Sequence, residues 1–494
     1  MNQASNIDYK KAFEDSQIRI SILEAELAQF RRLIFGKKSE RFITEEIPFP
    51  QGSLFAPQEI EITKEENTTE NLTEQITYER NKLLRKKGGR KELPSHLKRE
   101  VIIIEPENKL ESDRHIGTLV TEELEYIPGI MLVNRIERPK YIDDKTEEIK
   151  VASIPTRPVP KSQFSAQMMA HVICNKYVDH NPLYRQIEQF KRNHEVVISR
   201  SSLGESVHQY MDLLTPLYDA LKKEVLSQEY LQNDETPYKV QSEEKKGSTH
   251  LGYFWASRSP IHNQVLFTYQ RGRSEAHMVD HLQGFFGKLQ TDGYKTYEKF
   301  EHDPNTILFS CWAHARRYFD QALETHPQEA KKVLAYIQEL YKVESYCRDH
   351  NTDNNKREKI RQEKSKEWLH KIKEYLDQLS LSKVLPATPL GKAIAYTLKR
   401  WHNLIRYIDH GEVEIDNNLL ENSIRPIALG RKNYLFAGSH ESAQRAAMIY
   451  SFFGTCKLHN INPFEWLKYV LQNINEYPIN RIQELLPHNW KPKN

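Results

Sequence analysis

The sequence has no uninterrupted run of about 18 apolar residues, which is the length that would span a bilayer. Its first residues also lack the basic and then apolar pattern of a secretory signal. We therefore expect no membrane partner and a cytoplasmic location. Cysteine is scarce, and the four that occur are far apart, with no CxxC pair: Cys174, Cys311, Cys347 and Cys456. This scarcity argues against a disulfide framework and predicts reduced, mostly buried thiols.

Charge of one sign is not in large excess either, because the formal net charge is only +3. Such a balance neither requires nor excludes a nucleic-acid partner, since the local distribution of charge matters more than the sum. The distribution here is uneven. Residues 59–79 are rich in Glu, whereas residues 82–99 carry eight Lys and Arg. An acidic spacer thus precedes a basic arm.

With 494 residues, the chain exceeds the size at which a single core stops growing, about 250–300 residues, so we expect several domains. Near the N-terminus, apolar residues recur at three- and four-residue steps. That pattern predicts a helix, which is either a short coiled coil or an amphipathic helix packed on its own chain. The Pro-, Glu- and Thr-containing stretch that follows is typical of a disordered linker.

Two further regions precede the centre of the chain. Residues 101–104 and 125–141 show β-rich, alternating stretches, which predict a small β-containing domain. Residues 165–202 are typical of helices with one break near Asn181 and Pro182 and another between His194 and Ser199. A helix-turn-helix and a plain helical connector both fit this pattern.

From residue 230 the pattern changes to short apolar runs that predict strands, with a helix over 274–282 between the third and fourth of them. The runs are 230–231, 252–256, 264–269, 286–289 and 307–312. Residues 316–408 then have the composition and periodicity of helices. Asp416 is placed to cap a helix that ends at Gly430, and Ser439 is placed to cap the next one.

Three acidic residues are singled out by their positions at the ends of these elements. Asp234 follows the first strand, Asp292 ends the fourth strand, and Glu421 lies one turn into the helix after Asp416. Carboxylates at strand ends can face a shared cleft. Magnesium prefers oxygen ligands, and two such ions can assist an in-line phosphoryl displacement. The alternative is ordinary surface charge, because the chain has 68 Asp and Glu residues.

Basic and polar residues supply candidate contacts to DNA. His314 is a candidate for phosphate binding or proton transfer, with a structural histidine as the alternative. Arg425 shares the helix face of Glu421, and Arg431 and Lys432 are expected in a turn after Gly430, where solvated loop charge is the alternative to phosphate contact. The full set of DNA-binding and auxiliary candidates is Arg85, Lys86, Lys87, Arg90, Lys91, Arg425, Arg431, Lys432 and Asn433, with His314 and Arg317.

These strings, taken in order, resemble the large transposases of the bacterial insertion sequence 66 group. The resemblance is carried by residues 35–41, 138–141, 176–185, 234–237, 292–294, 311–317 and 416–439. It implies an RNase H-like catalytic core in which Asp234, Asp292 and Glu421 are the DDE acids that hold two Mg²⁺ or Mn²⁺ ions. It also implies that the helical stretch is an insertion before the last acid. Family members commonly carry CxxC pairs ahead of the core, but residues 111–148 contain no cysteine. We therefore expect no structural zinc.

The fold class we expect is a multidomain α/β protein, and its parts can be assigned to residue ranges. They are an N-terminal helix or coiled coil (1–44), an acidic disordered linker (45–80), a basic arm with a small β-rich domain (81–158), a helical DNA-binding region (159–228), an RNase H-like core (229–315 and 412–455), a helical insertion (316–411) and a C-terminal helical element (456–494).

The expected function is DNA transposition: binding of the terminal inverted repeats of an insertion sequence, metal-dependent cleavage, and strand transfer into target DNA. Partners would be double-stranded DNA, further copies of the chain and companion proteins of the same element. Two other functions remain open at this point. One is a catalytically inactive DNA-binding regulator, and the other is a metal-dependent nuclease without joining activity.

Overall fold

The computed structural model describes residues 129–142, 149–151, 157–160, 162–242, 247–382 and 384–491. They belong to two compact units, which divide between residues 153 and 154. The expected N-terminal helix, the acidic linker and the basic residues Arg85, Lys86, Lys87, Arg90 and Lys91 lie outside the described residues.

The described part of the smaller unit contains a two-stranded antiparallel sheet. Strands β1 (Lys140–Ile142) and β2 (Ile149–Val151) pair with Tyr141 opposite Lys150. Within the β-rich stretch 125–141, residues 129–139 form no regular element. Ile130 and Val133 are 85% and 90% exposed, so the alternating apolar residues have no core face to cover there.

In the larger unit, four helices lie between residues 166 and 226. The helices are α2 (Ala166–Tyr177), α3 (Leu183–His194), α4 (Arg200–Asp212) and α5 (Thr215–Leu226). Both expected breaks are present. Ser165 and Ser199 cap α2 and α4 by accepting backbone N–H bonds of 3.1 and 3.0 Å, as the preference of serine for the N-cap requires.

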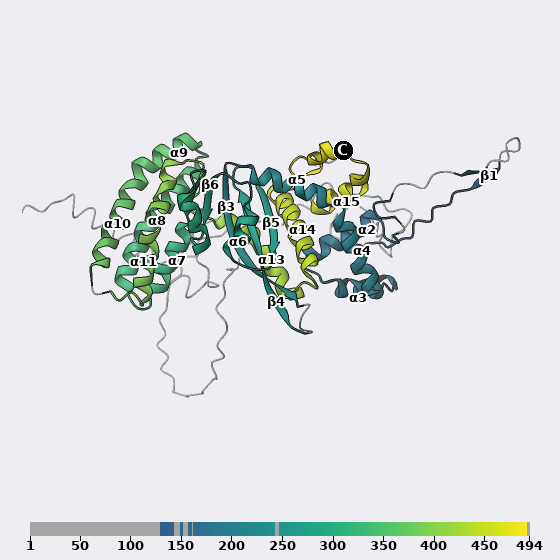
Figure 1. Cartoon of the computed structure of the whole chain (residues 1–494), viewed down its shortest axis with the longest axis horizontal. Helices are drawn as coiled ribbons and strands as arrows, with labels where there is room; N and C mark the ends of the chain where they lie inside the picture. Colours follow the sequence, from purple (N-terminus) through teal and green to yellow (C-terminus); the bar gives the residue numbers. More distant parts are fainter. Residues whose placement is uncertain are drawn as a thin grey trace, which may run out of the picture. The chain divides into compact units, whose positions relative to one another are not determined.

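A five-stranded mixed sheet forms the centre of the larger unit (Figure 1). Its strands are β3 (Tyr230–Gln241), β4 (Thr249–Ser259), β5 (Gln264–Gln270), β6 (Gly287–Thr291) and β7 (Thr306–Ser310). Their spatial order is β5-β4-β3-β6-β7. The first three strands pair antiparallel, and β6 runs parallel to both β3 and β7. Helix α6 (Glu275–His281) connects β5 to β6, as the sequence predicted.

Strand β3 is much longer than the sequence pattern predicts, and Asp234 therefore lies within it. The residues beyond Leu231 are mostly polar and therefore show no apolar pattern that would predict a strand. They nevertheless pair with β4 as far as Gln241. β6 pairs only with residues Tyr230–Gln232, and Ala437 bridges Val240 further along the same side, so within the described part of the chain residues 233–238 have no strand partner on this side. An open edge also tolerates the exposed Pro237, which has no N–H to donate.

Residues 312–409, which follow β7, form helices where the sequence predicts the helical insertion. Its elements are α7 (Trp312–Ala322), α8 (Pro327–Asp349), α9 (Asn354–Ile360), the π-helical turn η2 (Arg361–Ser365), α10 (Lys366–Ser380), α11 (Pro389–Lys399), α12 (Trp401–Ile405) and η3 (Arg406–Asp409). The expected boundary at 315/316 falls inside α7. Tyr230 and Phe309 of the sheet share one apolar core with Trp312 and Leu376, so insertion and sheet are packed together.

Three helices complete the larger unit: α13 (Asn418–Tyr434), α14 (His440–Leu458) and α15 (Pro463–Asn473). Helix α14 packs along β5, and α13 contacts β3 and β4 (Figure 1). Ser439 caps α14 as predicted. In the described part of the chain, no helix is both long enough and apolar enough to cross a membrane.

Both predicted ends of the helix bearing Glu421 need correction. The N-cap is Asn417, although Asp416 Oδ1 accepts the Asn418 N–H at 3.1 Å. Helix α13 does not end at Gly430 but continues to Tyr434. Gly430 is buried, and a Cβ there would collide with the hydroxyls of Tyr434 and Tyr450. This glycine therefore permits close packing instead of ending the helix.

Candidate functional site

Parallel strands β3 and β6 bring two of the predicted acids to the same edge of the sheet. Gln232 of β3 is the register partner of Gln290 of β6, and Asp234 and Asp292 each lie two residues further on. Parallel strands therefore deliver both carboxyl groups at the same level. One carboxylate oxygen each from Asp234, Asp292 and Glu235 lies within 4.8 Å of the others. This acidic cluster contains two of the three predicted metal-binding acids, Asp234 and Asp292.

Asp234 lies in a strongly acidic environment. Burial, followed by the negative charges of Asp292, Glu235 and Glu421, holds the pKa of Asp234 well above its ordinary value. Its Oδ1 accepts the Glu235 N–H at 2.7 Å, which acts in the opposite direction. A carboxyl group whose pKa is raised by neighbouring carboxylates favours a bound cation, because a cation removes the repulsion.

Glu235 is a member of the cluster that the sequence analysis missed. Asp234 was selected as the acid that follows the predicted strand, and the pattern gave no separate signal for its neighbour. Its side chain is 1% exposed and forms an ion pair with Arg273. Tyr297 donates its hydroxyl to Glu235 Oε2 at 3.1 Å. Burial and then Asp292 raise the pKa of Glu235 to about 7, against the opposing effect of Arg273.

Asp292 is positioned by the turn that follows β6. Its Oδ1 accepts the Tyr294 N–H at 2.8 Å, and Gly293 adopts a φ of +83°. Two residues of the insertion hold the backbone of the same turn. Tyr396 donates its hydroxyl to the Asp292 carbonyl at 2.5 Å, and Arg400 donates to the Gly293 carbonyl at 2.5 Å. The insertion thus contributes directly to the position of this acid.

Glu421 lies in the first turn of α13, beside two of the predicted auxiliary residues. Its Oε1 is 3.9 Å from His314 Nε2 and 3.7 Å from Arg317 Nη2, both on α7. The first turn of a helix favours negative charge. Glu421 is not one of the three acids with mutually close oxygens, but its charge contributes to the raised pKa of Asp234. The structure therefore groups Asp234 with Asp292 and places Glu421 near enough to act on Asp234.

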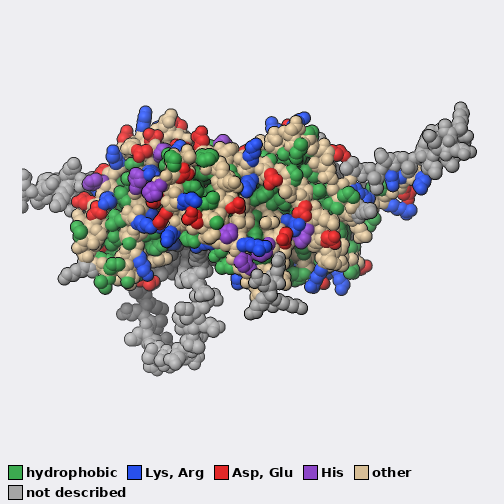
Figure 2. Space-filling view, viewed as in Figure 1, with side chains coloured by type: hydrophobic (Ala, Val, Ile, Leu, Met, Phe, Trp, Pro, Cys, Tyr) green, Lys and Arg blue, Asp and Glu red, His purple; other side chains and the backbone are tan. Residues whose placement is uncertain are grey.

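The predicted basic residues after Glu421 lie on helix α13 and not in a turn. Arg425 is one turn beyond Glu421 and is half-buried. Arg431 donates to the Pro237 carbonyl, and Asn433 donates to the Leu429 carbonyl at 3.3 Å. Lys432 is exposed. On the face that Figure 2 shows, acidic and basic side chains are intermingled over the described residues, with no extended patch of one sign.

A buried polar network lies directly behind the acidic cluster. Asn233 Oδ1 is bonded to the Ser257 hydroxyl at 2.6 Å and lies 3.0 Å from His281 Nε2. His281 Nδ1 is 2.7 Å from the Thr268 hydroxyl. Burial, assisted by Lys222, lowers the pKa of His281 to about 3, so this imidazole is neutral. The network ties β3, β4, β5 and α6 together next to the strand that carries Asp234.

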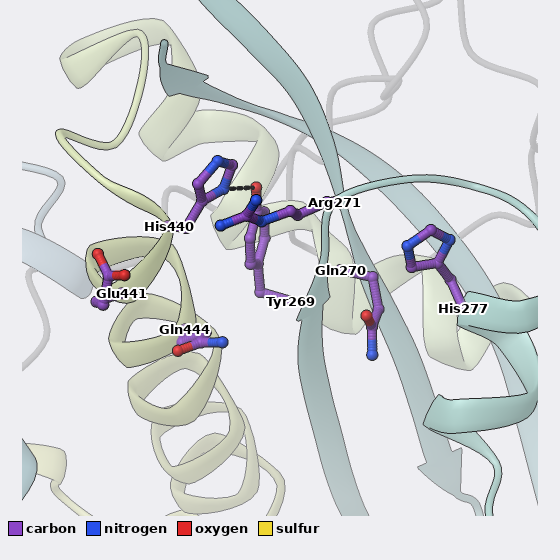
Figure 3. A pocket seen from close by; sticks show the side chains of 7 residues that line it. All are labelled: Tyr269, Gln270, Arg271, His277, His440, Glu441 and Gln444. Carbon is purple, nitrogen blue, oxygen red and sulfur yellow. Dashed lines mark hydrogen bonds between the residues drawn. The ribbon is translucent and has the colours of Figure 1, made fainter. Parts of the chain in front are cut away.

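A shallow cavity of about 270 Å³ lies between the end of β5 and the start of α14 (Figure 3). Its lining side chains carry mixed charge: Tyr269, Gln270, Arg271, His277, His440, Glu441 and Gln444. None of them belongs to the acidic cluster. Arg271 faces this cavity, whereas Arg273, two residues later, pairs with Glu235. The cavity and the acidic cluster are therefore separate features on either side of one loop.

Three models of protein families match successive parts of this chain. The family model described as "Transposase IS66 family" matches residues 161–445, and "IS66 C-terminal element" matches residues 451–488. A third model, "Transposase C of IS166 homeodomain", matches residues 22–102, which include the second half of the predicted N-terminal helix and the basic residues between 82 and 99.

Full-length relatives occur in Sinorhizobium fredii. Uncharacterized protein y4jD is 30% identical over 492 residues, covering 95% of this chain and 94% of that protein. Uncharacterized protein y4qI is 30% identical over 512 residues, covering 99% of this chain and 93% of that protein. The resemblance inferred from short strings of sequence is thus confirmed over nearly the entire length, and the chain belongs to the transposase family of insertion sequence 66.

Proposed function

We propose that this chain is a DNA transposase that binds the terminal inverted repeats of its insertion sequence and catalyses metal-dependent cleavage and strand transfer. The observation that carries the proposal is the convergence of Asp234 and Asp292 at one edge of the sheet, in a chain of a transposase family. The strand order, three antiparallel strands followed by two parallel ones on the other side of β3, supports an RNase H-like core.

The acids fit divalent cations such as Mg²⁺ or Mn²⁺. The close group contains carboxylate oxygens only, which are the donors that these hard ions prefer. The mutual repulsion that raises the pKa of Asp234 would be relieved by positive charge. Asp234 and Asp292 would therefore hold the metal. Glu421 is the third proposed ligand, and its electrostatic effect on Asp234 supports that assignment.

The reaction would be two successive in-line phosphoryl transfers. Water first breaks a P–O bond at the element end and frees its 3′-hydroxyl. This 3′-hydroxyl then attacks a phosphate of the target DNA, where the new bond replaces the target's P–O3′ bond and a target 3′-hydroxyl leaves. Bound divalent ions would supply activation of the attacking oxygen and neutralisation of charge on the phosphate. The chain itself orients the acids: the Tyr294 N–H fixes the Asp292 carboxylate, and Arg273 holds Glu235. Arg317, 3.7 Å from Glu421, is placed to restrain that side chain.

We assign DNA binding to the basic residues of the chain. Arg85, Lys86, Lys87, Arg90 and Lys91 lie in the segment matched by the homeodomain model. Arg425 and Lys432 extend along the helix that bears Glu421. We propose that these residues contact DNA phosphates. Assembly with further copies of the chain and with companion proteins of the element remains a prediction, as does the absence of structural zinc.

The test replaces Asp292 by Asn in cells that carry the complete element, so that any companion protein is present. We expect excision and insertion of the element to fall by at least about two orders of magnitude, because removing one group that acts in the transition state has effects of that size. Binding of the purified variant to the element ends should stay within about twofold of the wild type. Asp219→Asn is the matched control, since Asp219 is exposed on α5, away from the cluster.

The same experiment separates the alternative functions. A pure DNA-binding regulator would show no metal-dependent cleavage even in the wild-type form. A nuclease without joining activity would give cleaved ends but no joined products. Either result would reject the proposed transposase activity.

A further inference from the structure

The short segment that leads from the insertion into α13 is held by an unusual number of hydrogen bonds. Residues 410–417 form no helix or strand, yet they immediately precede α13, whose fourth residue is Glu421. The position of this return segment therefore determines where Glu421 lies. The inference drawn from it rests on the proposed function, in which Glu421 is one of three metal-binding acids.

From the insertion side, the return segment is held by the completely buried guanidinium of Arg361. Two of its N–H groups donate to the carboxylate oxygens of Glu344, each at 2.8 Å. The other three donate to the backbone carbonyls of Tyr407, His410 and Val413, at 2.8, 2.8 and 2.9 Å. All five guanidinium donors are thus used: one holds the 3-10 helix η3 at Tyr407, and two hold the return segment, which has no regular secondary structure of its own to fix it.

Two further side chains of the insertion extend this contact towards α13. Arg357 bridges Glu344 at 2.6 Å and both oxygens of Glu414, at 3.0 and 2.8 Å. Tyr341 donates its hydroxyl to Asp416 Oδ2 at 2.8 Å, two residues before α13 begins. The insertion therefore contacts the return segment from His410 to Asp416.

Three consecutive carbonyls of the same segment are bound by two strands of the sheet and by the first residue of α7. Gln290 donates to the Glu414 carbonyl at 2.7 Å, and Gln232 donates to the Asp416 carbonyl at 2.8 Å. The Ile415 carbonyl between them accepts the Trp312 N–H at 3.2 Å. Gln232 and Gln290 are the residues two positions before Asp234 and Asp292. The strands that carry the first two acids thus also bind the segment that delivers the third.

We propose that the helical insertion is a positioning device for Glu421, with Arg361 and Tyr341 as positioning residues that set the start of α13 against β3 and β6. A buried ion cluster is a costly way to stabilise a fold, and apolar residues of similar volume often do as well. Apolar residues, however, cannot bind three backbone carbonyls at once. The arrangement is therefore suited to fixing geometry, and Arg361 and Tyr341 act on Glu421 through the segment that precedes α13.

The sharpest variant is Tyr341→Phe, which removes one hydroxyl and keeps the ring. Tyr346→Phe is its matched control, since Tyr346 lies on the same helix and is 43% exposed. Hydrogen exchange in the metal-free protein should accelerate in residues 418–424 for Tyr341→Phe, with β3 and β6 unchanged. The Mg²⁺ concentration for half-maximal cleavage should rise about fivefold, the equivalent of one lost hydrogen bond, while affinity for DNA stays the same.

Arg361→Lys provides the second test, because lysine keeps the charge but offers three donors in place of five. We expect the same two changes as in Tyr341→Phe, but larger, together with a lower unfolding temperature. Unchanged exchange in 418–424 for both variants would overturn the inference. So would faster exchange with an unchanged Mg²⁺ requirement, which would mean that the insertion serves stability alone. If the wild type shows no metal-dependent cleavage, the proposed function fails, and the exchange measurement still decides whether the insertion holds α13.

Discussion

Arg273 pairs with Glu235 at the edge of the acidic cluster, and its guanidinium also lies 3.7 Å from the centre of the Tyr294 ring. Glu235 follows Asp234 in β3, and Tyr294 is the residue whose N–H fixes Asp292. One cation therefore contacts the neighbours of both acids. It offsets part of the negative charge that accumulates there when no metal is bound.

Replacing Arg273 by Ala should make the thermal stability of the protein depend more strongly on bound Mg²⁺. Without the guanidinium, three close carboxylates repel one another, so the metal-free form should unfold at a lower temperature. Added Mg²⁺ should then raise the unfolding temperature more in the variant than in the wild type. The check is thermal unfolding with and without Mg²⁺. Arg271→Ala is the control, since Arg271 faces the separate cavity, and a similar response in both variants would contradict the role given to Arg273.

Replacing Gly293 by Ala should disrupt the turn that positions Asp292. Gly293 has a φ of +83°, and a Cβ at this position would collide with Arg400. We expect cleavage to fall by about 100-fold, because a displacement of about 1 Å at a reacting centre can have that effect. Gly284→Ala is the control, since Gly284 has a φ of +87° but nothing within 4 Å of an added Cβ. Equal losses of activity in the two variants would show that backbone strain alone is responsible.

Lys432 and Arg431 should respond differently to substitution although they are neighbours. Lys432 is exposed, so Lys432→Ala should lower the slope of log affinity for DNA against log salt by about one, as for a lost phosphate contact. Arg431 donates to the Pro237 carbonyl of β3, so Arg431→Ala should instead lower the unfolding temperature. Binding measured over a range of salt concentrations, together with thermal unfolding, tests both. An unchanged slope for Lys432→Ala would remove this residue from the DNA contacts.

His281 should make stability fall as the pH falls. Its pKa is about 3 in the folded protein and near 6.5 when unfolded, so between these values the unfolded chain binds a proton that the folded chain does not. Its contribution to stability is complete above pH 6.5 and is lost towards pH 3, at up to about 1.4 kcal/mol per pH unit. His281→Gln should be less stable at pH 7 but lose less stability between pH 7 and 4.5. Urea unfolding at several pH values measures this, with the exposed His302→Gln as control.

Much of the sheet could be predicted, because its central strands are short apolar runs bounded by turn residues. The end of β3 could not, since residues 233–241 are held by pairing with β4 and not by an apolar pattern. Glu235 was missed because the apolar pattern ended the first strand at residue 231 and gave no separate signal for the residue beside Asp234. The approach of the three carboxylates depends on the pairing of β3 with β6. The turn predicted after Gly430 was wrong. The glycine is needed there because a Cβ would collide with the hydroxyl of Tyr450, a residue that the local sequence pattern does not include.

The interruption of the core by the insertion also has a consequence during synthesis of the protein. The ribosome delivers β3 and β6 early, whereas Glu421 emerges only after every helix that binds its preceding segment has been made. A growing chain could therefore fold its sheet while its third proposed acid is still missing. The order of translation would keep nascent chains from cutting DNA until the whole insertion has folded.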